Sequence, residues 1–419
     1  MKIKTWILAF GLVLATSAAI FFNAPKPAFA RSQELDEGAI ALVGARVYVS
    51  PLQVIGNGVV IIRDGKIAAV GSRSQVHVPQ GVGIVDCGGM SIMAGFQNSH
   101  VHFTEPKWND AAKLPGDELT QQLADMFTRY GFTSVVDTGS NLENTKALRQ
   151  RVDSGELLGP RILTAGTPLY PPDGVPYYVK STLPPDILKR LPQPATAADA
   201  VKQVDEHVAQ GADVIKLFTG SWVARGQVVT MPVEVAKAAA DEAHKKGKLV
   251  FAHPSNVAGF QIALEANVDV LAHAVEDLHG WNRSYTTRMK QQGMWMIPTL
   301  KLFMKDSNLK DILNEVQDFS AAKGPILFGT DVGFLEDYDP AVEYSLMKRS
   351  GMDFPQILES LTSAPARRFG ESNIRGQVKP GLNADLVVVA GDPQDDIRAL
   401  TRVNYTFRDG RIIYPVPEP

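Results

Sequence analysis

Two histidines spaced two residues apart, His100 and His102, are the residues of this chain whose type and spacing most directly suggest chemistry. They follow a short apolar stretch at residues 93–96. In a β-strand, side chains two apart point to the same face, about 7 Å apart at about 3.3 Å per residue. Two imidazoles on one face can therefore bind one metal ion. A lone His-x-His pair is a weak signal, so it needs partners elsewhere in the chain.

Further residues that can bind a metal lie at or near the C-terminal ends of other apolar stretches. They are Lys216 within residues 213–218, His253 at the end of 249–253, His273 at the end of 270–273 and Asp331 at the end of 326–331. A lysine inside an apolar strand is rare unless it is paired. In a barrel of parallel strands these ends open onto one face, where such enzymes place catalysis. We therefore expect the side chains to meet there.

Short apolar strands alternate with helix-like stretches through the middle of the chain, which is typical of the α/β class. This alternation predicts a (β/α)8 TIM barrel over residues 93–370. The expected strands are the His-x-His strand and residues 133–137, 161–165, 214–218, 249–253, 270–273, 296–299 and 326–331. The alternative is a doubly wound open sheet, which would normally carry a glycine-rich first loop that is not found here.

The two ends of the chain share a different pattern, in which Asp-Gly pairs separate apolar runs. Asp64-Gly65 and Asp409-Gly410 are strong hairpin signals, and residues 385–390 add a buried strand. This pattern predicts one small β-sandwich domain built from residues 31–92 and 371–419.

The first 30 residues resemble a secretory signal peptide rather than part of either domain. Lys2 and Lys4 precede an apolar run at residues 6–22, and Ala28-Phe29-Ala30 matches a cleavage site. The pattern predicts a secreted or periplasmic protein without membrane contact after cleavage; an uncleaved membrane anchor is the alternative. The single cysteine, Cys87, allows no intramolecular disulfide and is expected to be a buried thiol. The 42 basic and 45 acidic residues suggest no nucleic-acid surface.

Taken together, the metal-capable residues resemble the binuclear, lysine-containing form of the amidohydrolase superfamily. Gly-Pro-Arg-Ile at residues 159–162 and Leu-Thr-Ser-Ala-Pro-Ala at 361–366 resemble its imidazolonepropionase and prolidase-like branch. Gly-Leu-Asn-Ala-Asp-Leu at residues 381–386 is similar to a C-terminal signature of the superfamily. The superfamily usually has aspartate two residues before its first histidine. Asn98 stands there instead, which could shift metal preference without removing a ligand.

The resemblance implies two divalent metal ions, for which zinc suits the ligands. It implies one metal held by His100, His102 and Asp331, the second held by His253 and His273, and a carbamate on Lys216 that bridges them. A metal-bridging hydroxide would attack a carbonyl, and Asp331 would pass the proton to the leaving nitrogen. The expected reaction is hydrolysis of an amide C–N bond in a dipeptide, an N-acyl amino acid or a cyclic amide.

A proline-rich stretch at residues 168–194 follows the third expected barrel strand and is predicted to be a substrate-side lid. Tyr177 or Tyr178 from this stretch, with Arg225, could bind a substrate carboxylate. His279 follows the sixth strand and could approach the substrate. The partner we expect is a small molecule, and a homo-oligomer is a family-level expectation. Other histidines are expected to lie at the surface or in solvent, namely His77, His207 and His244.

Three other functions stay open. The same metal pair could hydrolyse a lactone, an ester or a phosphotriester. A mononuclear deaminase would have no use for Lys216. A non-catalytic metal-binding scaffold would be expected to lose ligands, and none of the six is missing.

Overall fold

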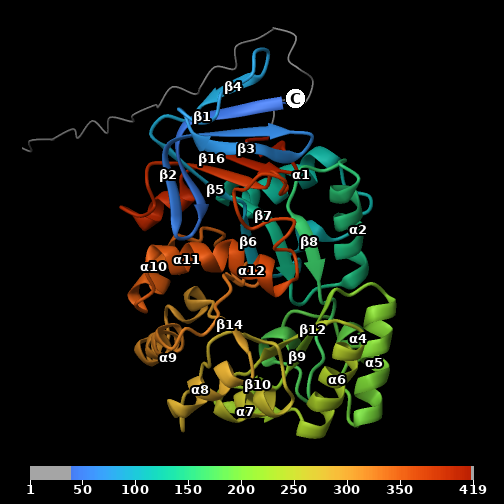
Figure 1. The fold of residues 1–419 in the computed structure, drawn as a ribbon. Coiled ribbons are helices and arrows are strands. Elements are labelled where there is room, and N and C mark those ends of the chain that lie inside the picture. The colour runs from blue at the N-terminus through green and yellow to red at the C-terminus, as the bar shows by residue number, and fades with distance from the viewer. Residues whose placement is uncertain (1–38, 417–419) are drawn as a thin grey trace, which may run out of the picture.

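The computed structural model describes residues 39–416, which form a mixed α/β fold (Figure 1). The predicted signal peptide lies outside the described residues. In Figure 1, strands from the two ends of the chain lie together at one end of the molecule, and the helices surround the remainder. None of the helices within residues 39–416 is both long enough and apolar enough to cross a membrane.

The sheet at the chain ends contains eight strands, in the order β17-β16-β15-β5-β1-β2-β3, with β4 paired to β1. Apolar side chains pack on both of its faces, which is consistent with the predicted sandwich. The strands are β1 (Ala39–Ser50), β2 (Gln53–Arg63), β3 (Lys66–Ser72), β4 (Gly83–Asp86), β5 (Met90–Ala94), β15 (Leu386–Ala390), β16 (Val403–Arg408) and β17 (Arg411–Tyr414).

Both predicted Asp-Gly hairpins are confirmed, and their turns pack against each other. Asp64 and Gly65 have φ values of 51° and 76°, and Asp409 and Gly410 have 48° and 75°. Two consecutive positive φ values are what a two-residue hairpin turn requires. A Cβ built on Gly410 would lie 2.9 Å from the Cα of Gly65. This close contact joins the β2–β3 hairpin to the β16–β17 hairpin.

The parallel strands of the middle region form two sheets, β6-β7-β8 and β14-β13-β12-β9. They correspond to the first seven predicted barrel strands. Their bounds are β6 (Phe96–Val101), β7 (Phe132–Asp137), β8 (Arg161–Thr164), β9 (Val214–Phe218), β12 (Leu249–His253), β13 (Val270–Ala272) and β14 (Trp295–Ile297). A short antiparallel hairpin, β10 (Gly220–Ala224) and β11 (Gln227–Thr230), follows β9.

Backbone hydrogen bonds link the two parallel sheets at both of their edges. At one edge, the Leu169 amide donates to the Lys216 carbonyl at 2.9 Å. At the other edge, the Leu327 amide donates to the Met296 carbonyl, also at 2.9 Å. The Ser99 amide then donates to the Phe328 carbonyl at 2.7 Å, which brings the segment at 326–331 beside β6. This cyclic order is the one that an eight-stranded barrel requires.

The predicted eighth strand at residues 326–331 is not a regular strand. It pairs through isolated bridges, Ile326 with Met296 and Val332 with Val101. Asp331 has a φ of 60°, so the extended backbone conformation ends there. The prediction of a regular strand was therefore wrong, although the segment occupies the expected place.

Helices pack around the parallel strands, and some of them begin with a side-chain cap. Helix α11 begins with a capping box in which the side chains of Asp353 and Gln356 bond to each other's backbone amides, and Pro355 occupies its first turn. The α-helices are α1 (Gly116–Met126), α2 (Leu142–Asp153), α3 (Tyr177–Lys180), α4 (Pro185–Leu188), α5 (Ala197–Ala209), α6 (Val233–Lys245), α7 (Val257–Glu265), α8 (Ser284–Gln291), α9 (Leu309–Ala321), α10 (Ala341–Arg349), α11 (Phe354–Leu361) and α12 (Ser363–Arg368). The 3-10 helices are η1 (Pro106–Trp108), η2 (Thr128–Tyr130), η3 (Leu300–Phe303) and η4 (Ile397–Thr401).

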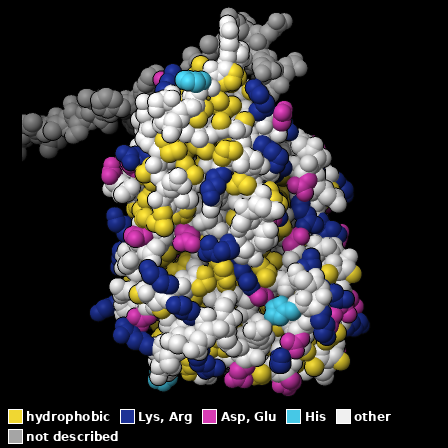
Figure 2. Space-filling view, in the orientation of Figure 1, with side chains coloured by type: hydrophobic (Ala, Val, Ile, Leu, Met, Phe, Trp, Pro, Cys, Tyr) yellow, Lys and Arg dark blue, Asp and Glu magenta, His cyan; other side chains and the backbone are white. Residues whose placement is uncertain are grey.

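The surface carries both signs of charge. Lys and Arg side chains are interspersed with Asp and Glu side chains over the face shown in Figure 2. Cys87 is fully buried, as expected, and burial raises the pKa of its thiol to about 12.

Candidate metal centre

His100 lies on β6 and His102 directly follows this strand, and Asp331 lies beside them on the neighbouring segment. The Nε2 atoms of His100 and His102 are 3.2 Å and 2.9 Å from the Oδ1 atom of Asp331. The Asp331 amide donates to the His100 carbonyl at 2.9 Å, which holds the two segments in register. The structure therefore brings Asp331 to a histidine pair that is far from it in the sequence, with one carboxylate oxygen facing both imidazoles.

The backbone of the loop that follows β7 fixes the orientation of His102. Its Nδ1 atom is 2.8 Å from the Gly139 carbonyl, which can only accept a hydrogen bond. Nδ1 is therefore the protonated nitrogen, and Nε2 of a neutral His102 presents a lone pair to Asp331. A lone pair and a carboxylate oxygen repel each other at 2.9 Å unless a cation or proton lies between them.

The loop that contains Gly139 is itself held by the buried carboxylate of Asp137. This carboxylate accepts from the Gly139 amide at 3.1 Å, the Ser140 hydroxyl at 2.6 Å and the Thr164 hydroxyl at 2.7 Å. Gly139 also has no room for a side chain, because a Cβ there would lie 2.9 Å from Pro168. Asp137 therefore acts on His102 through the backbone.

His273 directly follows β13, and its ring is oriented by the hydroxyl of Thr299, which lies just after the next strand, β14. Its Nδ1 atom is 2.7 Å from the Thr299 hydroxyl oxygen, and this hydroxyl donates to the Pro298 carbonyl at 2.9 Å. Because the hydroxyl proton is used there, Thr299 must accept from Nδ1–H. The Nε2 lone pair of His273 is then available for a ligand, and this is how a metal-binding histidine is usually held.

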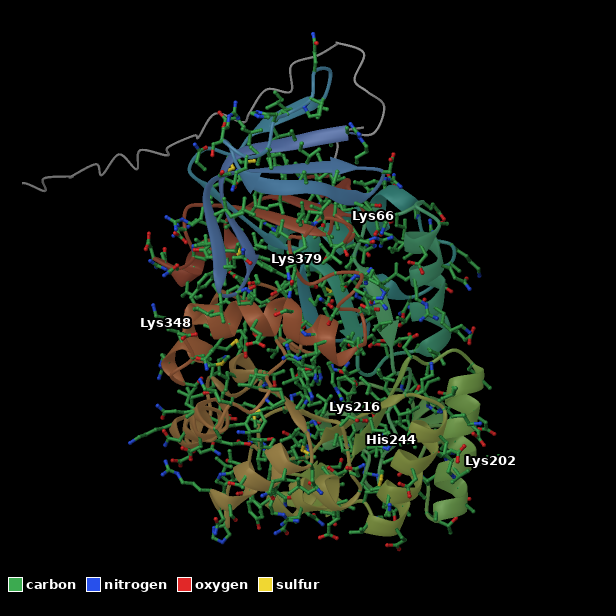
Figure 3. The ribbon with its side chains drawn as sticks, in the orientation of Figure 1. Lys66, Lys202, Lys216, His244, Lys348 and Lys379 are labelled. Carbon is green, nitrogen blue, oxygen red and sulfur yellow. The ribbon has the colours of Figure 1, made fainter. Side chains whose placement is uncertain are left out.

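His253 and Lys216 complete the set of predicted ligands. The ring of His253 lies 4.6 Å from that of His273 and is stacked on Phe218 at 4.4 Å. The His273 ring in turn lies 4.4 Å from that of His100. Lys216 lies in the interior, whereas Lys202 and Lys348 lie at the outer edges of the molecule (Figure 3). The Lys216 side chain is only 2% exposed, and no salt bridge to it is found within residues 39–416.

Burial and mutual repulsion govern the charges of these groups. Burial lowers the pKa of Lys216 to about 7, so this amine loses its proton far more readily than a surface lysine. Burial, together with the Lys216 charge, lowers the pKa of His100 to about 3 and that of His253 well below 6.5. Burial alone would raise the pKa of Asp331, but its contacts with His100 outweigh this effect and hold the pKa well below 3.8.

The residues present fit a metal centre. Several buried atoms here have no hydrogen-bond partner, namely Nδ1 and Nε2 of His100, Nε2 of His253 and Oδ1 of Asp331. Within residues 39–416, one group of this kind is found: His100, His273 and Asp331 each offer a donor atom, and these atoms all lie within 4.8 Å of one another. Unpartnered buried lone pairs from imidazole and carboxylate are the donor set that zinc and similar divalent ions take.

Asn98 lies beneath this site. Its amide donates to the Thr330 hydroxyl at 2.7 Å, and its side-chain oxygen accepts from the His100 amide at 3.3 Å. Asn98 therefore links β6 to the segment that carries Asp331.

The residues proposed for substrate binding lie in different surroundings. Tyr178 is half-buried and packs at 5.3 Å on Phe334, three residues beyond Asp331; burial, with the charges of Asp331 and Glu276, raises its pKa well above 10. Tyr177 is 42% exposed, and Arg225 is exposed at the turn between β10 and β11. The structure thus brings Tyr178 toward the metal ligands and leaves Arg225 at the surface.

A further pair was missed by the sequence reasoning. The Trp222 indole donates to the Glu276 carboxylate at 2.6 Å, and Glu276 lies three residues after His273. Burial raises the pKa of Glu276. The position of Glu276 just beyond a ligand strand was the signal available in the sequence. Trp222 follows the Lys216 strand, β9, but nothing in the sequence marks it as the partner of Glu276.

Two expectations about other histidines were wrong. His207 is half-buried, and its Nε2 atom contacts the Thr167 carbonyl at 2.9 Å. His244 is half-buried and pairs with Asp269 at 2.8 Å. Each lies on a helix face that turns toward a neighbouring loop, so each is only partly exposed to solvent. His77 and His279 are exposed.

Comparison with known proteins places this arrangement among enzymes. The sequence is 23% identical to ochratoxinase from Aspergillus niger over 435 residues, which cover 90% of this chain and 87% of that protein. The fold is similar to that of a Xaa-Pro dipeptidase with methionine bound in its active site, with a TM-score of 0.77 and 22% identity over 89% of this chain and 99% of that one. Molinate hydrolase gives a TM-score of 0.74 and 20% identity over 91% and 96% of the two chains.

The family model described as "Amidohydrolase family" matches residues 91–413, which is most of the chain and includes all six candidate ligands. The chain therefore belongs to the amidohydrolase family.

Proposed function

We propose that this protein is a binuclear metal-dependent hydrolase that cleaves an amide C–N bond in a small substrate. The observation that carries the proposal is the convergence of four histidines, one carboxylate and one lysine in a buried cluster with unpartnered ligand atoms. Ochratoxinase, Xaa-Pro dipeptidase and molinate hydrolase are named for hydrolytic reactions, and these similarities support a hydrolase. The cyclic order of the parallel strands also supports a closed barrel in which the cluster lies at the C-terminal strand ends.

Two divalent ions, when bound, would polarise a substrate carbonyl and lower the pKa of a water molecule toward about 7. His100, His102 and Asp331 would hold one ion, and His253 and His273 the other. Lys216 would join the two after reaction of its amine with carbon dioxide. The low pKa that burial gives this lysine supports the step, because only the neutral amine reacts.

Asp331 is the residue that we assign to proton transfer. Its carboxylate stays ionised because its contacts with His100 and His102 outweigh the effect of burial. It can therefore accept a proton from the attacking water and return that proton to the leaving nitrogen. His273 and His102 cannot do this work with Nδ1, because that atom is committed to Thr299 or to the Gly139 carbonyl.

We infer that Tyr178 lines the substrate side of the site, between Asp331 and the Trp222–Glu276 pair. The same proposal includes three further points. The protein belongs to the prolidase-like branch, the chain divides into an end-sheet domain and a barrel at residues 92 and 371, and residues 1–30 direct its export. The N-terminal sequence of protein recovered from the periplasm or medium tests the last point, because cleavage predicts that it begins at Arg31.

The decisive experiment combines metal analysis with a substrate screen. Chelator-treated protein is reloaded with Zn²⁺ or Mn²⁺ and tested on dipeptides, N-acyl amino acids, cyclic amides, lactones and phosphotriesters. The proposal predicts about two ions per chain and metal-restored cleavage of at least one amide class. Turnover of esters or phosphotriesters alone would contradict the assigned bond type. One bound ion with deamination would contradict the binuclear mechanism.

A further inference from the structure

Three aromatic side chains, Tyr177, Tyr178 and Phe334, form a connected group that we call the aromatic cluster. The Tyr178 ring lies 5.5 Å from that of Tyr177 and 5.3 Å from that of Phe334, edge to face in both cases. Tyr177 is 42% exposed and Phe334 is 47% exposed. Within residues 39–416, no other phenylalanine, tyrosine or tryptophan side chain is as exposed. Exposed apolar side chains that gather in one place are typical of an interaction surface.

The backbone holds Phe334 next to Asp331. The amides of Phe334 and Leu335 donate to the Asp331 carbonyl at 3.2 Å and 2.9 Å, so the chain turns tightly here. Within this turn, the Val332 carbonyl accepts from the His102 amide at 2.8 Å. Asp331 is 3% exposed, whereas Phe334 is an exposed residue. Phe334 therefore lies at the outer edge of the candidate metal centre, on the side of Asp331.

The proline-rich stretch that carries the two tyrosines is anchored next to a different candidate ligand, His253. The Tyr170 ring of this stretch lies 4.8 Å from that of Phe218, and the Phe218 ring is stacked on His253 at 4.4 Å. The contact between Tyr178 and Phe334 therefore connects the His253 side of the centre with its Asp331 side. The aromatic cluster thus spans two sides of the candidate metal centre.

The exposed apolar surface is of the size of one substrate side chain. A stable contact between two proteins buries about 800 Å² on each partner, whereas an aromatic side chain supplies about 150–250 Å². The residues that follow the aromatic cluster in the sequence include Lys180, Glu336 and Asp337, which are exposed and charged. Two exposed rings beside such residues are too small for a stable protein interface. They can cover one bulky apolar group of a small substrate.

The place of Asp331 indicates which part of the substrate this group belongs to. The inference rests on the proposed function, in which Asp331 returns a proton to the leaving nitrogen. The amine part of the substrate then lies on the Asp331 side, where Phe334 is exposed. A bulky apolar group on that amine would remove the exposed rings from water, which favours binding.

We propose that the aromatic cluster binds an aromatic or other bulky apolar group on the amine part of the substrate, so that the enzyme prefers amides whose leaving amine carries such a group. Phe334 and Tyr177 supply the exposed rings. Tyr178 holds the two rings together, because it contacts both of them.

Pairs of amides with the same acyl group test this preference in the metal-loaded protein. The pairs are glycyl-L-phenylalanine with glycyl-L-alanine, and N-acetyl-L-phenylalanine with N-acetyl-L-alanine. In a pair that is cleaved, we expect kcat/KM to be at least about tenfold higher for the phenylalanine member. Phe334→Ala should lower this ratio about tenfold and Tyr177→Ala about threefold, mainly through KM, because an apolar contact is made equally in the ground state and the transition state.

The control variant is Leu52→Ala, which should leave the ratio unchanged. It removes another apolar side chain, 89% exposed, at the turn between β1 and β2. Equal kcat/KM values within each cleaved pair would overturn the inference and leave the proposed function in place. An unchanged ratio in Phe334→Ala would do the same.

A binding measurement that needs no turnover separates this inference from the proposed function. Titration calorimetry compares 3-phenylpropionate with propionate; both carry the same carboxylate, so the difference in affinity reports the ring. We expect 3-phenylpropionate to bind at least about tenfold more tightly, and Phe334→Ala to remove most of that difference. This result without cleavage of any amide would support the apolar subsite and overturn the assigned reaction alone. A dimer in sedimentation that dissociates in Phe334→Ala would overturn the inference in favour of a contact between two copies of the chain.

Discussion

Replacing Thr299 with valine tests whether the hydrogen bond to His273 prepares that imidazole for a metal. Valine keeps the size and branching of threonine, so the packing around this fully buried residue is retained. The substitution removes the oxygen that lies 2.7 Å from His273 Nδ1 and leaves the N–H buried without an acceptor. Either nitrogen of His273 can then carry the proton, and the metal must select the correct form.

The size of the effect follows from that single lost acceptor. An unsatisfied buried donor costs about 1–3 kcal/mol, which corresponds to a factor of about 10–100 in affinity. Loss of the group that orients a metal-binding histidine has an effect of the same size. We therefore expect Thr299→Val to raise the metal dissociation constant about 10–100-fold, with a smaller loss of catalytic rate when the metal is saturating.

Competition with a chromophoric chelator measures this affinity, and thermal unfolding of the metal-free protein measures stability. The matched control is Thr120→Val on α1, which removes another buried hydroxyl that accepts from a backbone amide, that of Leu158 at 3.2 Å. This control should lose stability and keep its metal affinity. An unchanged metal affinity in Thr299→Val, or an equal loss in Thr120→Val, would refute the reasoning.

Three further predictions concern Lys216, a glycine beside His102 and the buried carboxyl group of Glu315. Lys216→Met should keep the fold, since methionine fills a similar buried space. Metal analysis should find a metal content below about two ions per chain, and rate assays should find hydrolysis slowed by at least about 100-fold. Gly333→Ala should destabilise the protein by more than about 1 kcal/mol, because the new Cβ would lie 1.9 Å from the His102 carbonyl oxygen. The control is Gly370→Ala, which is also at positive φ but has no atom within 4 Å of the built Cβ. Thermal unfolding should show a clearly smaller loss of stability for this control. Burial raises the pKa of Glu315 well above 4.5, so the folded state binds this proton more tightly than the unfolded state does, and the free energy of unfolding should fall as pH rises above 4.5. In denaturant titrations, Glu315→Gln should reduce the slope of unfolding free energy against pH by up to about 1.4 kcal/mol per pH unit. An unchanged slope would contradict this.

The residues that cluster in the candidate metal centre could be selected from the sequence because strand ends are readable. His253 and His273 each end an apolar run, and in a parallel sheet such ends meet at one edge. The pairing of the two chain ends was also readable, since Asp64-Gly65 and Asp409-Gly410 fix both hairpin turns through their positive φ values. In each case one residue type reports a local backbone requirement.

The supporting contacts were not readable, because they join residue types that occur everywhere in a protein. The Gly139 carbonyl holds His102 from 37 positions away, and the Thr299 hydroxyl holds His273 from 26 positions away. No local pattern distinguishes these residues from other glycines and threonines. The error at His244 has the same origin, because its helix looks polar locally while the carboxylate of Asp269 comes from another loop.

The backbone at the metal centre explains why these supports are needed. His273 and Asp331 have φ values of 116° and 60°, in the region that side chains other than glycine rarely adopt. Such conformations cost about 1–3 kcal/mol each and persist only where the surroundings fix them. The amides of both residues are fixed, His273 to the Ile297 carbonyl at 3.0 Å and Asp331 to the His100 carbonyl at 2.9 Å. The neighbouring strands therefore supply the stability that this strained arrangement requires. The fold alone thus holds the candidate ligands in place, so the proposed metal binding is expected to add stability without a large change in secondary structure.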